Sequence, residues 1–350
     1  MTTNRSLLLS ILAAIFGTIF NTAPAQALDG QIAVLHNRRP VAVRVTLPEF
    51  VDNQLLSSPL VTMLNLPNDM VPDSTGCLCF DLNDDRFAFV HTFFHTHQII
   101  ASYNVFLVEL GKPALNGVQF TLGKDDSMPT TGSASLRDVP RIGMTSPTPA
   151  VEVFTIAHEV AHLVDYRIGN RPTPTFVDLK SESEEAGVTE GTANILAALH
   201  LGMSGIPAFT ADSLDSPQPN VDTFIRFPDL LITRRDVMQG MVDAPLFSIR
   251  YPTFINIIRD NLANPDLDLY LNEPDEYSSS AVINQPIWQA ATQFGFATMK
   301  RLYLRTLANW HEDQVNYNTL AKQLVDEAKA ISEDFSRILE LQFRQRGLSL

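Results

Sequence analysis

Short stretches of alternating hydrophobic and polar residues dominate the chain between residues 28 and 79, as in VAVRVTLP. Alternation with a period of two is typical of β-strands, and the intervening Pro and Asn residues are typical of turns. The pattern therefore predicts strands and loops over 28–79. Further strands are predicted at VQFTL, after the Asn116-Gly117 turn, and within RDVPRIGM, with a polar loop at DDSMPTTGSAS between them.

Residues 81–113 have a different pattern, in which Phe, Val, Ile and Leu cover most of a helical circumference. Acidic residues at Asp84 and Asp85 favour a helix start, and Gly111 favours a helix end. A helix that is apolar on nearly all sides is normally buried. We therefore expect one long central helix here.

The stretch FTIAHEVAHLVDY is predicted to lie in a helix that starts with Thr148 as N-cap and Pro149 in its first turn, and ends at Gly169. The next helix is predicted from a capping box of Ser181 and Glu184 and should stop near Gly202. Beyond it, PDLLITRRDVMQGMV and the segments that follow to the C-terminus are strongly helical in pattern. The chain is thus predicted to be α+β, with a mixed β/α N-terminal lobe over 28–147 that contains the long central helix, and a mostly helical lobe over 148–350.

The first 27 residues have the features of a cleavable export signal. Arg5 precedes an apolar run from Leu7 to Phe20, and Ala25 and Ala27 form an A-x-A site. The alternative is an uncleaved anchor, but the run is shorter than the roughly 20 residues that a spanning helix needs. We therefore predict a protein that is periplasmic or secreted, with no stable membrane span after cleavage.

Composition narrows the range of partners. The formal net charge is −14 with a sequence pI near 4.9, which disfavours binding to nucleic acid. The two cysteines, Cys77 and Cys79, stand two residues apart and could pair with each other in an exported protein.

His158 and His162 stand one helical turn apart, with Glu159 directly after the first. Histidines at this spacing share one helix face and can present ring nitrogens to one zinc ion, while the glutamate can act as a base. A catalytic zinc needs a third protein ligand and an open position for water. The pattern therefore predicts a zinc site with a ligand still to be found.

Glu190 is the preferred third ligand, because the small residues around it would allow its helix to approach the motif helix closely. Asn194 lies one turn beyond Glu190 on the same face. The rivals are Glu182, Glu184 and Glu185, which stand at the acidic start of the helix where solvent explains them, and Asp165, which lies on the motif helix itself.

His158-Glu159-x-x-His162 followed by Glu190 in TEGTAN resembles the gluzincin metallopeptidases, particularly the thermolysin and fungalysin group. The similarity extends over residues 80–347, although it is diffuse beyond these positions. It implies a two-lobed, thermolysin-like fold with one catalytic zinc between the lobes. It also implies hydrolysis of peptide bonds in a peptide or protein substrate, with Glu159 as general base and Asn194 orienting His158 from the second coordination shell.

The chain departs from this family at two positions. The family has an acidic residue where Asn194 stands, and a histidine that stabilises the transition state where Val282 stands, two residues before Asn284. Tyr166, Arg250, Tyr251 and Tyr277 are candidate replacements, although each is more simply explained by packing or a solvated surface. The alternative function is therefore a catalytically weak or inactive zinc-holding protein that binds peptides or partners.

Two other groups have weaker patterns for metal binding. His91, His95 and His97 share one stretch of the central helix, where hydrogen-bonded core histidines are the simpler expectation. DLNDD could bind Ca²⁺, but it lacks the ordered EF-hand pattern and serves as a helix start.

Overall fold

The computed structural model describes residues 28–36, 39–51, 54–82, 84–123, 133–136, 139–144, 153–169, 179–202, 224–227, 230–233 and 281–350. The predicted signal segment over 1–27 lies outside these residues. So does the predicted helix start at Thr148 and Pro149. The described part is a mixed α+β structure.

The first sheet has the order β2-β1-β4. Strand β1 (Asp29–His36) pairs antiparallel with β2 (Arg39–Thr46) and parallel with β4 (Cys77–Leu78). At the start of β1, Asp29 accepts a hydrogen bond from Arg44 Nε at 2.8 Å. At Gly30, a Cβ atom would lie 2.7 Å from Val90 Cγ1, so the absence of a side chain lets β1 approach the helix behind it.

The second sheet has the order β3-β5-β7-β6. Strands β3 (Val61–Leu64), β5 (Val118–Leu122) and β7 (Pro140–Met144) run parallel, and β6 (Ser133–Leu136) joins β7 antiparallel at the edge. The prediction of a loop up to residue 135 was wrong for β6. Its Ser and Ala residues have no strong strand preference, and pairing with β7 decides their conformation.

The predicted central helix is α2 (Asp85–Glu109). The side chain of Asp84 caps its first turn by accepting a hydrogen bond from the Arg86 amide, and Gly111 follows its end with a φ of 68°. Buried residues occur around most of its circumference, and it packs against β1, β3 and a helix that carries the histidine motif. The prediction of a buried central helix is confirmed.

The motif helix is α4 (Val153–Ile168), and α5 (Leu179–Leu201) packs along it. The predicted ends are confirmed, because Gly169 and Gly202 follow the two helices with φ angles of 62° and 65°. The predicted capping box was wrong. An N-cap residue has a non-helical backbone, whereas residues 179 and 180 are already helical before Ser181.

Helices α11 (Ala281–Phe294), α12 (Phe296–Ala308), α13 (Tyr317–Lys329) and α14 (Glu333–Gln345) form the C-terminal part. The expectation of helix throughout the preceding region was wrong for LLIT. This stretch forms β9 (Leu230–Thr233), paired antiparallel with β8 (Phe224–Phe227). Its β-branched residues fit a strand once a partner strand is present.

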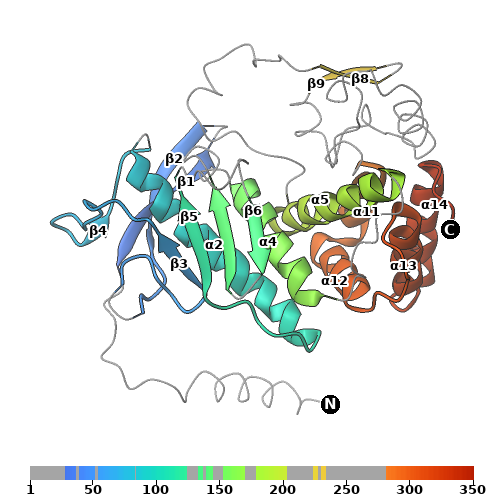
Figure 1. The fold of residues 1–350 in the computed structure, drawn as a ribbon, viewed down its shortest axis with the longest axis horizontal. Helices are drawn as coiled ribbons and strands as arrows, with labels where there is room; N and C mark the ends of the chain where they lie inside the picture. The colour runs from blue at the N-terminus through green and yellow to red at the C-terminus, as the bar shows by residue number, and fades with distance from the viewer. Residues whose placement is uncertain are drawn as a thin grey trace.

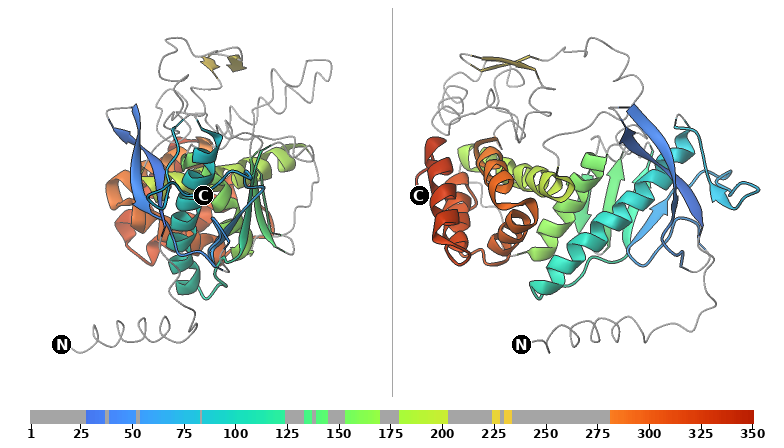
Figure 2. Two further views of the ribbon diagram at one scale, coloured as in Figure 1. Left: turned by 90° about the vertical axis from the view of Figure 1, so that its left-hand side faces the viewer. Right: turned by 180° about the vertical axis from the view of Figure 1, so that it is seen from behind.

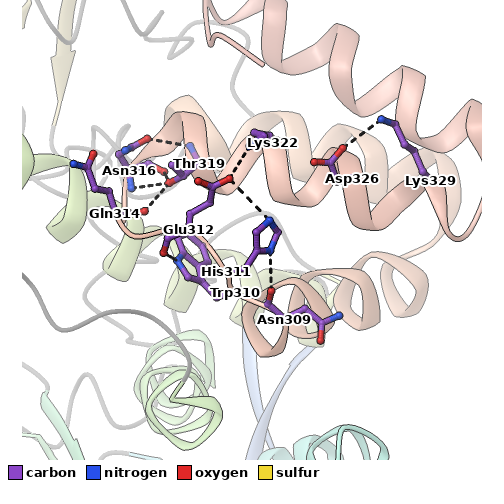
Figure 3. A network of polar contacts seen from close by, with 10 residues as sticks. All are labelled: Asn309, Trp310, His311, Glu312, Gln314, Asn316, Thr319, Lys322, Asp326 and Lys329. Atoms are coloured by element: carbon purple, nitrogen blue, oxygen red, sulfur yellow. Dashed lines mark hydrogen bonds and ion pairs between the residues drawn. The ribbon is translucent and has the colours of Figure 1, made fainter.

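A network of polar contacts fixes the connection between α12 and α13 (Figure 3). Trp310 Nε1 donates to the Glu312 carbonyl at 2.9 Å, and Lys322 Nζ lies 2.7 Å from Glu312 Oε1. Asn316 and Thr319 form a reciprocal capping box at the start of α13. These contacts fix the start of α13 relative to the end of α12.

The first two sheets and α2 lie on one side of α4 and α5, and helices α11 to α14 lie on the other side (Figures 1 and 2). Most described strands belong to the N-terminal half of the chain, and the described helices that follow α5 belong to the C-terminal half. The histidine motif is therefore placed in the middle of the fold.

Within the described residues, no helix is both long enough and apolar enough to cross a membrane.

Candidate metal centre

Helix α4 places His158, Glu159 and His162 in the interior. The three residues are 8%, 6% and 7% exposed, so none is a solvated surface residue. Apolar neighbours on α4, such as Val160 and Leu163, are fully buried and fix the rotation of the helix. This burial excludes the simplest alternative for the motif, a surface helix with two hydrated histidines.

Helix α5 brings Glu190 to the two histidines, as the sequence predicts. Glu190 Oε2 lies 3.1 Å from His158 Nε2 and 3.5 Å from His162 Nε2, and the two Nε2 atoms lie 3.0 Å apart. Among the described residues, this is the group of His, Cys, Asp and Glu side chains that could hold a metal ion.

The spacing of these three atoms fits a small tetrahedral cation. A zinc ion with ligands at about 2.0–2.1 Å places neighbouring ligand atoms about 3.3 Å apart. The observed distances of 3.0, 3.1 and 3.5 Å bracket this value. Two imidazoles and one carboxylate also match the donor set of catalytic zinc sites.

Asn194 defines which nitrogen of His158 is free to face the group. Its Oδ1 lies 2.9 Å from His158 Nδ1, and Asn194 is 4% exposed. An amide oxygen only accepts hydrogen bonds, so with this amide orientation His158 Nδ1 carries the proton and Nε2 presents a lone pair. The contact predicted between Asn194 and the first histidine is present.

The electrostatics of the group favour a cation at its centre. Burial raises the pKa of Glu190, but hydrogen bonds from His158 and His162 in their protonated form, together with their charge, outweigh burial and lower the pKa below its ordinary value. Burial lowers the pKa of His158, but Glu190, Glu159 and Asn194 outweigh it and raise the pKa. An ionised carboxylate thus stabilises positive charge on the imidazole side of the group.

Glu159 lies beside the group, and its pKa is shifted in the opposite direction to that of Glu190. Burial raises its pKa above the ordinary value, the two histidines oppose this effect and the charge of Glu190 adds to it. Its Oε2 atom is buried and has no hydrogen-bond partner among the described residues. A carboxyl group with a raised pKa and a free oxygen is suited to accept and return a proton.

The rival carboxylates do not join the group. Glu184 is 1% exposed, so the prediction that solvent accounts for it was wrong. Helix α5 begins at Leu179, so Glu184 lies in the second turn of the helix and not at its start. Asp165 is also buried, at 5% exposed. Neither belongs to the described metal-binding group, nor does Glu185. The side chain of Glu182 lies outside the described residues.

Val282 is fully buried in the core on α11, and Asn284 is buried two residues later. His200, in the last turn of α5, is not part of the group: its ring stacks on that of Tyr103, and its Nδ1 lies 3.5 Å from Lys300 Nζ. Of the candidate replacements for a second proton donor, Tyr166 contacts His162 through its ring. The others, Arg250, Tyr251 and Tyr277, lie outside the described residues.

Among the weaker metal candidates, His91, His97 and Asp84 have other partners. His91 Nδ1 accepts from the Ala33 amide at 3.0 Å, and His97 Nδ1 lies 2.9 Å from Ser58 Oγ. In DLNDD, Asp84 caps α2 and pairs with Arg86 at 2.7 Å, so its oxygens are already engaged. None of these residues belongs to the described metal-binding group.

The two cysteines, Cys77 and Cys79, form the disulfide that the sequence allowed, and it lies within and just after β4. β4 belongs to the first sheet, whereas the metal-binding group is carried by α4 and α5. The disulfide is therefore separate from the candidate metal centre.

Two hydrogen bonds that hold α5 in position could not be predicted from the sequence. Thr192 Oγ1 lies 2.9 Å from the Tyr303 hydroxyl, and Tyr103 donates to the Leu196 carbonyl at 2.8 Å. Both tyrosines are remote from α5 along the chain and resemble ordinary core aromatics in the sequence. They fix the helix that carries Glu190 and Asn194.

Comparison with known proteins leaves the site to be interpreted from its own geometry. No protein-family model matches the chain, and no curated protein matches it. The functional inference therefore depends on the motif and on the arrangement of the side chains.

Proposed function

We propose that this protein is an exported zinc-dependent metallopeptidase of the gluzincin type. The observation that carries the proposal is the convergence of His158, His162 and Glu190 at distances suited to one tetrahedral ion, with Glu159 buried beside them. A site that only stored a metal would have no need of Glu159.

His158, His162 and Glu190 would hold the ion. When bound, zinc supplies a Lewis acid that polarises a carbonyl and makes a bound water acidic near neutral pH. Asn194 keeps the Nδ1 proton of His158 in place, so that Nε2 remains available as a ligand. The two histidines and the glutamate thus leave one tetrahedral position for water or substrate.

Glu159 is assigned the proton transfers. Its unpartnered oxygen can accept the proton of the attacking water, and its raised pKa makes it a stronger base than an ordinary carboxylate. The protonated Glu159 would then return that proton to the leaving amine. The low exposure of its surroundings excludes bulk water, which strengthens these electrostatic effects. Glu159→Gln removes the base but keeps the shape of the side chain.

The edge strand β6 supports an extended peptide as the substrate. It ends the second sheet and packs against α4, the helix of the histidines. An exposed strand edge can bind an extended peptide by adding it as a further strand. Main-chain hydrogen bonds of this kind would bring a peptide bond alongside the histidine helix.

The arrangement of sheets, α4, α5 and C-terminal helices supports the further proposal of a thermolysin-like, two-lobed fold. We also propose that residues 1–27 are removed on export and that the mature protein is periplasmic or secreted. Strand β1 begins at Asp29, shortly after the proposed cut at Ala27, so cleavage there would leave the sheet intact.

A second candidate function is zinc-dependent peptide or partner binding with weak or no catalysis. It is favoured by Val282, which takes the place of a transition-state histidine and is fully buried in the core. Loss of one such donor typically costs about 10²–10³ in rate. The two candidates share the metal site and differ in the use of Glu159.

The decisive experiment measures zinc content and proteolysis on the chain from residue 28 to residue 350. Wild type and Glu159→Gln are purified, their zinc is quantified, and cleavage of an unfolded protein is followed. One zinc per chain with cleavage only by wild type is the expected result. One zinc with no cleavage by either protein would support the binding function, and no zinc would refute both.

The ligand assignment has its own control. Glu190→Gln should lose zinc, whereas Glu185→Gln, on the same helix and outside the group, should retain it. Glu184 is a poor control because its buried side chain would make substitution destabilising. Equal zinc loss in the Glu190 and Glu185 variants would refute the assignment.

A further inference from the structure

The two histidines of the metal-binding group are oriented in different ways. His158 has a hydrogen-bond partner on its outer nitrogen, Asn194 Oδ1 at 2.9 Å. The outer nitrogen of His162, Nδ1, is buried and has no hydrogen-bond partner among the described residues. Metal-binding histidines usually donate this second N–H to an acceptor, which fixes the ring. Among the described residues, the ring of His162 is therefore restricted by contacts other than a hydrogen bond at Nδ1.

Tyr166 lies one helical turn after His162 and contacts its ring. The two rings are nearly parallel, with an interplanar angle of 20° and centroids 6.2 Å apart. Tyr166 is 44% exposed, whereas His162 is 7% exposed. The tyrosine is therefore the more solvent-exposed ring of the pair.

The ring of Tyr166 is better placed for this role than its hydroxyl group. Its interaction with His162 is a ring contact and no hydrogen bond joins the two side chains. Stacking of aromatic rings restricts their rotation without needing a polar partner.

We propose that Tyr166 is a positioning residue that holds the imidazole of His162 in its metal-binding orientation through ring stacking, in place of a hydrogen-bond acceptor. This inference rests on the proposed zinc site. It makes the site asymmetric, with one histidine fixed by an amide and the other by an aromatic ring.

The test compares Tyr166→Phe with Tyr166→Ala. Zinc affinity is measured by competition with a chromophoric chelator, and the visible absorption of the Co²⁺-substituted protein reports ligand geometry. We expect Tyr166→Phe to match wild type in both, because the ring remains. We expect Tyr166→Ala to bind zinc about 3- to 10-fold more weakly, the range that one aromatic contact supports, with altered Co²⁺ bands.

Arg167→Ala is the matched control, because it shortens the next side chain on α4 without touching His162. Urea unfolding of each metal-free variant identifies any general loss of folding. Weakening by Tyr166→Phe equal to that by Tyr166→Ala would assign the effect to the hydroxyl and overturn the proposal. Wild-type affinity in Tyr166→Ala would also overturn it. A wild-type protein that binds no zinc would instead refute the proposed function, and with it this inference.

Discussion

Asn194→Ala should weaken zinc binding by more than it lowers the stability of the metal-free protein. Asn194 Oδ1 and His158 Nδ1 lie 2.9 Å apart, and both residues are buried. With zinc bound, His158 Nε2 must present its lone pair, so the proton stays on Nδ1. Removing the amide then leaves a buried donor without a partner.

The metal-free protein can avoid this cost. Its imidazole can move the proton to Nε2, which lies 3.1 Å from Glu190 Oε2 and can donate to it. The cost of an unpaired donor therefore falls only on the metal-bound state, whereas the loss of packing around Asn194 affects both states equally. A buried donor left unsatisfied costs about 1–3 kcal/mol, which corresponds to roughly 5- to 150-fold weaker zinc binding.

Chelator competition gives the zinc affinity, and urea unfolding in the presence of EDTA gives the stability of the metal-free protein. Asn194→Asp is the matched variant, because it restores an acceptor of the same shape and should keep zinc affinity at or above that of wild type. Loss of metal-free stability as large as the loss in binding energy would refute the tautomer argument. Unchanged zinc affinity in Asn194→Ala would refute the role of the amide.

Three further predictions concern stability, measured by urea unfolding of the metal-free protein. Tyr303→Phe should cost about 1–3 kcal/mol by stranding the Thr192 hydroxyl, and the double variant with Thr192→Val should recover part of this loss; simple additivity would contradict the pairing. Burial and the charge of Lys300 lower the pKa of His200 to about 4, so the unfolded state binds more protons than the folded state between pH 6.5 and 4. Stability should therefore fall by up to roughly 3 kcal/mol as the pH falls through this window. The stability of His200→Gln should fall less steeply, and an equal slope would refute the assignment. Gly30→Ala should cost about 1–3 kcal/mol by overpacking against Val90 and Leu47. Val90→Ala should relieve part of this cost, and no cost in Gly30→Ala would show that β1 can move away from α2.

Local patterns were sufficient to predict several elements. The acidic start and the glycine end of α2 act through neighbouring residues, and the structure places them as expected, with Asp84 as the cap. Gly169 and Gly202 end their helices for the same reason, since a left-handed backbone favours glycine. Interactions of this kind depend on only a few adjacent residues.

Elements that depend on a partner were predicted less well. Strand β6 was expected to be a loop because its own residues have little strand preference, and its hydrogen bonds come from β7. The LLIT stretch was expected to be helical, whereas it pairs with β8. The buried state of Glu184 depends on how α5 packs, which its position near the helix start does not reveal.

The sequence by itself determined the metal-binding residue types and their helical spacing, because His158, Glu159 and His162 lie within one turn of one helix. It also indicated Glu190 through the small residues that surround it. Only the tertiary structure decided that Glu190 Oε2 reaches both histidines, since that depends on the packing of α5 against α4. It alone decided the unequal support of the two imidazoles as well, because hydrogen bonds and ring contacts between side chains depend on distances that no local pattern encodes.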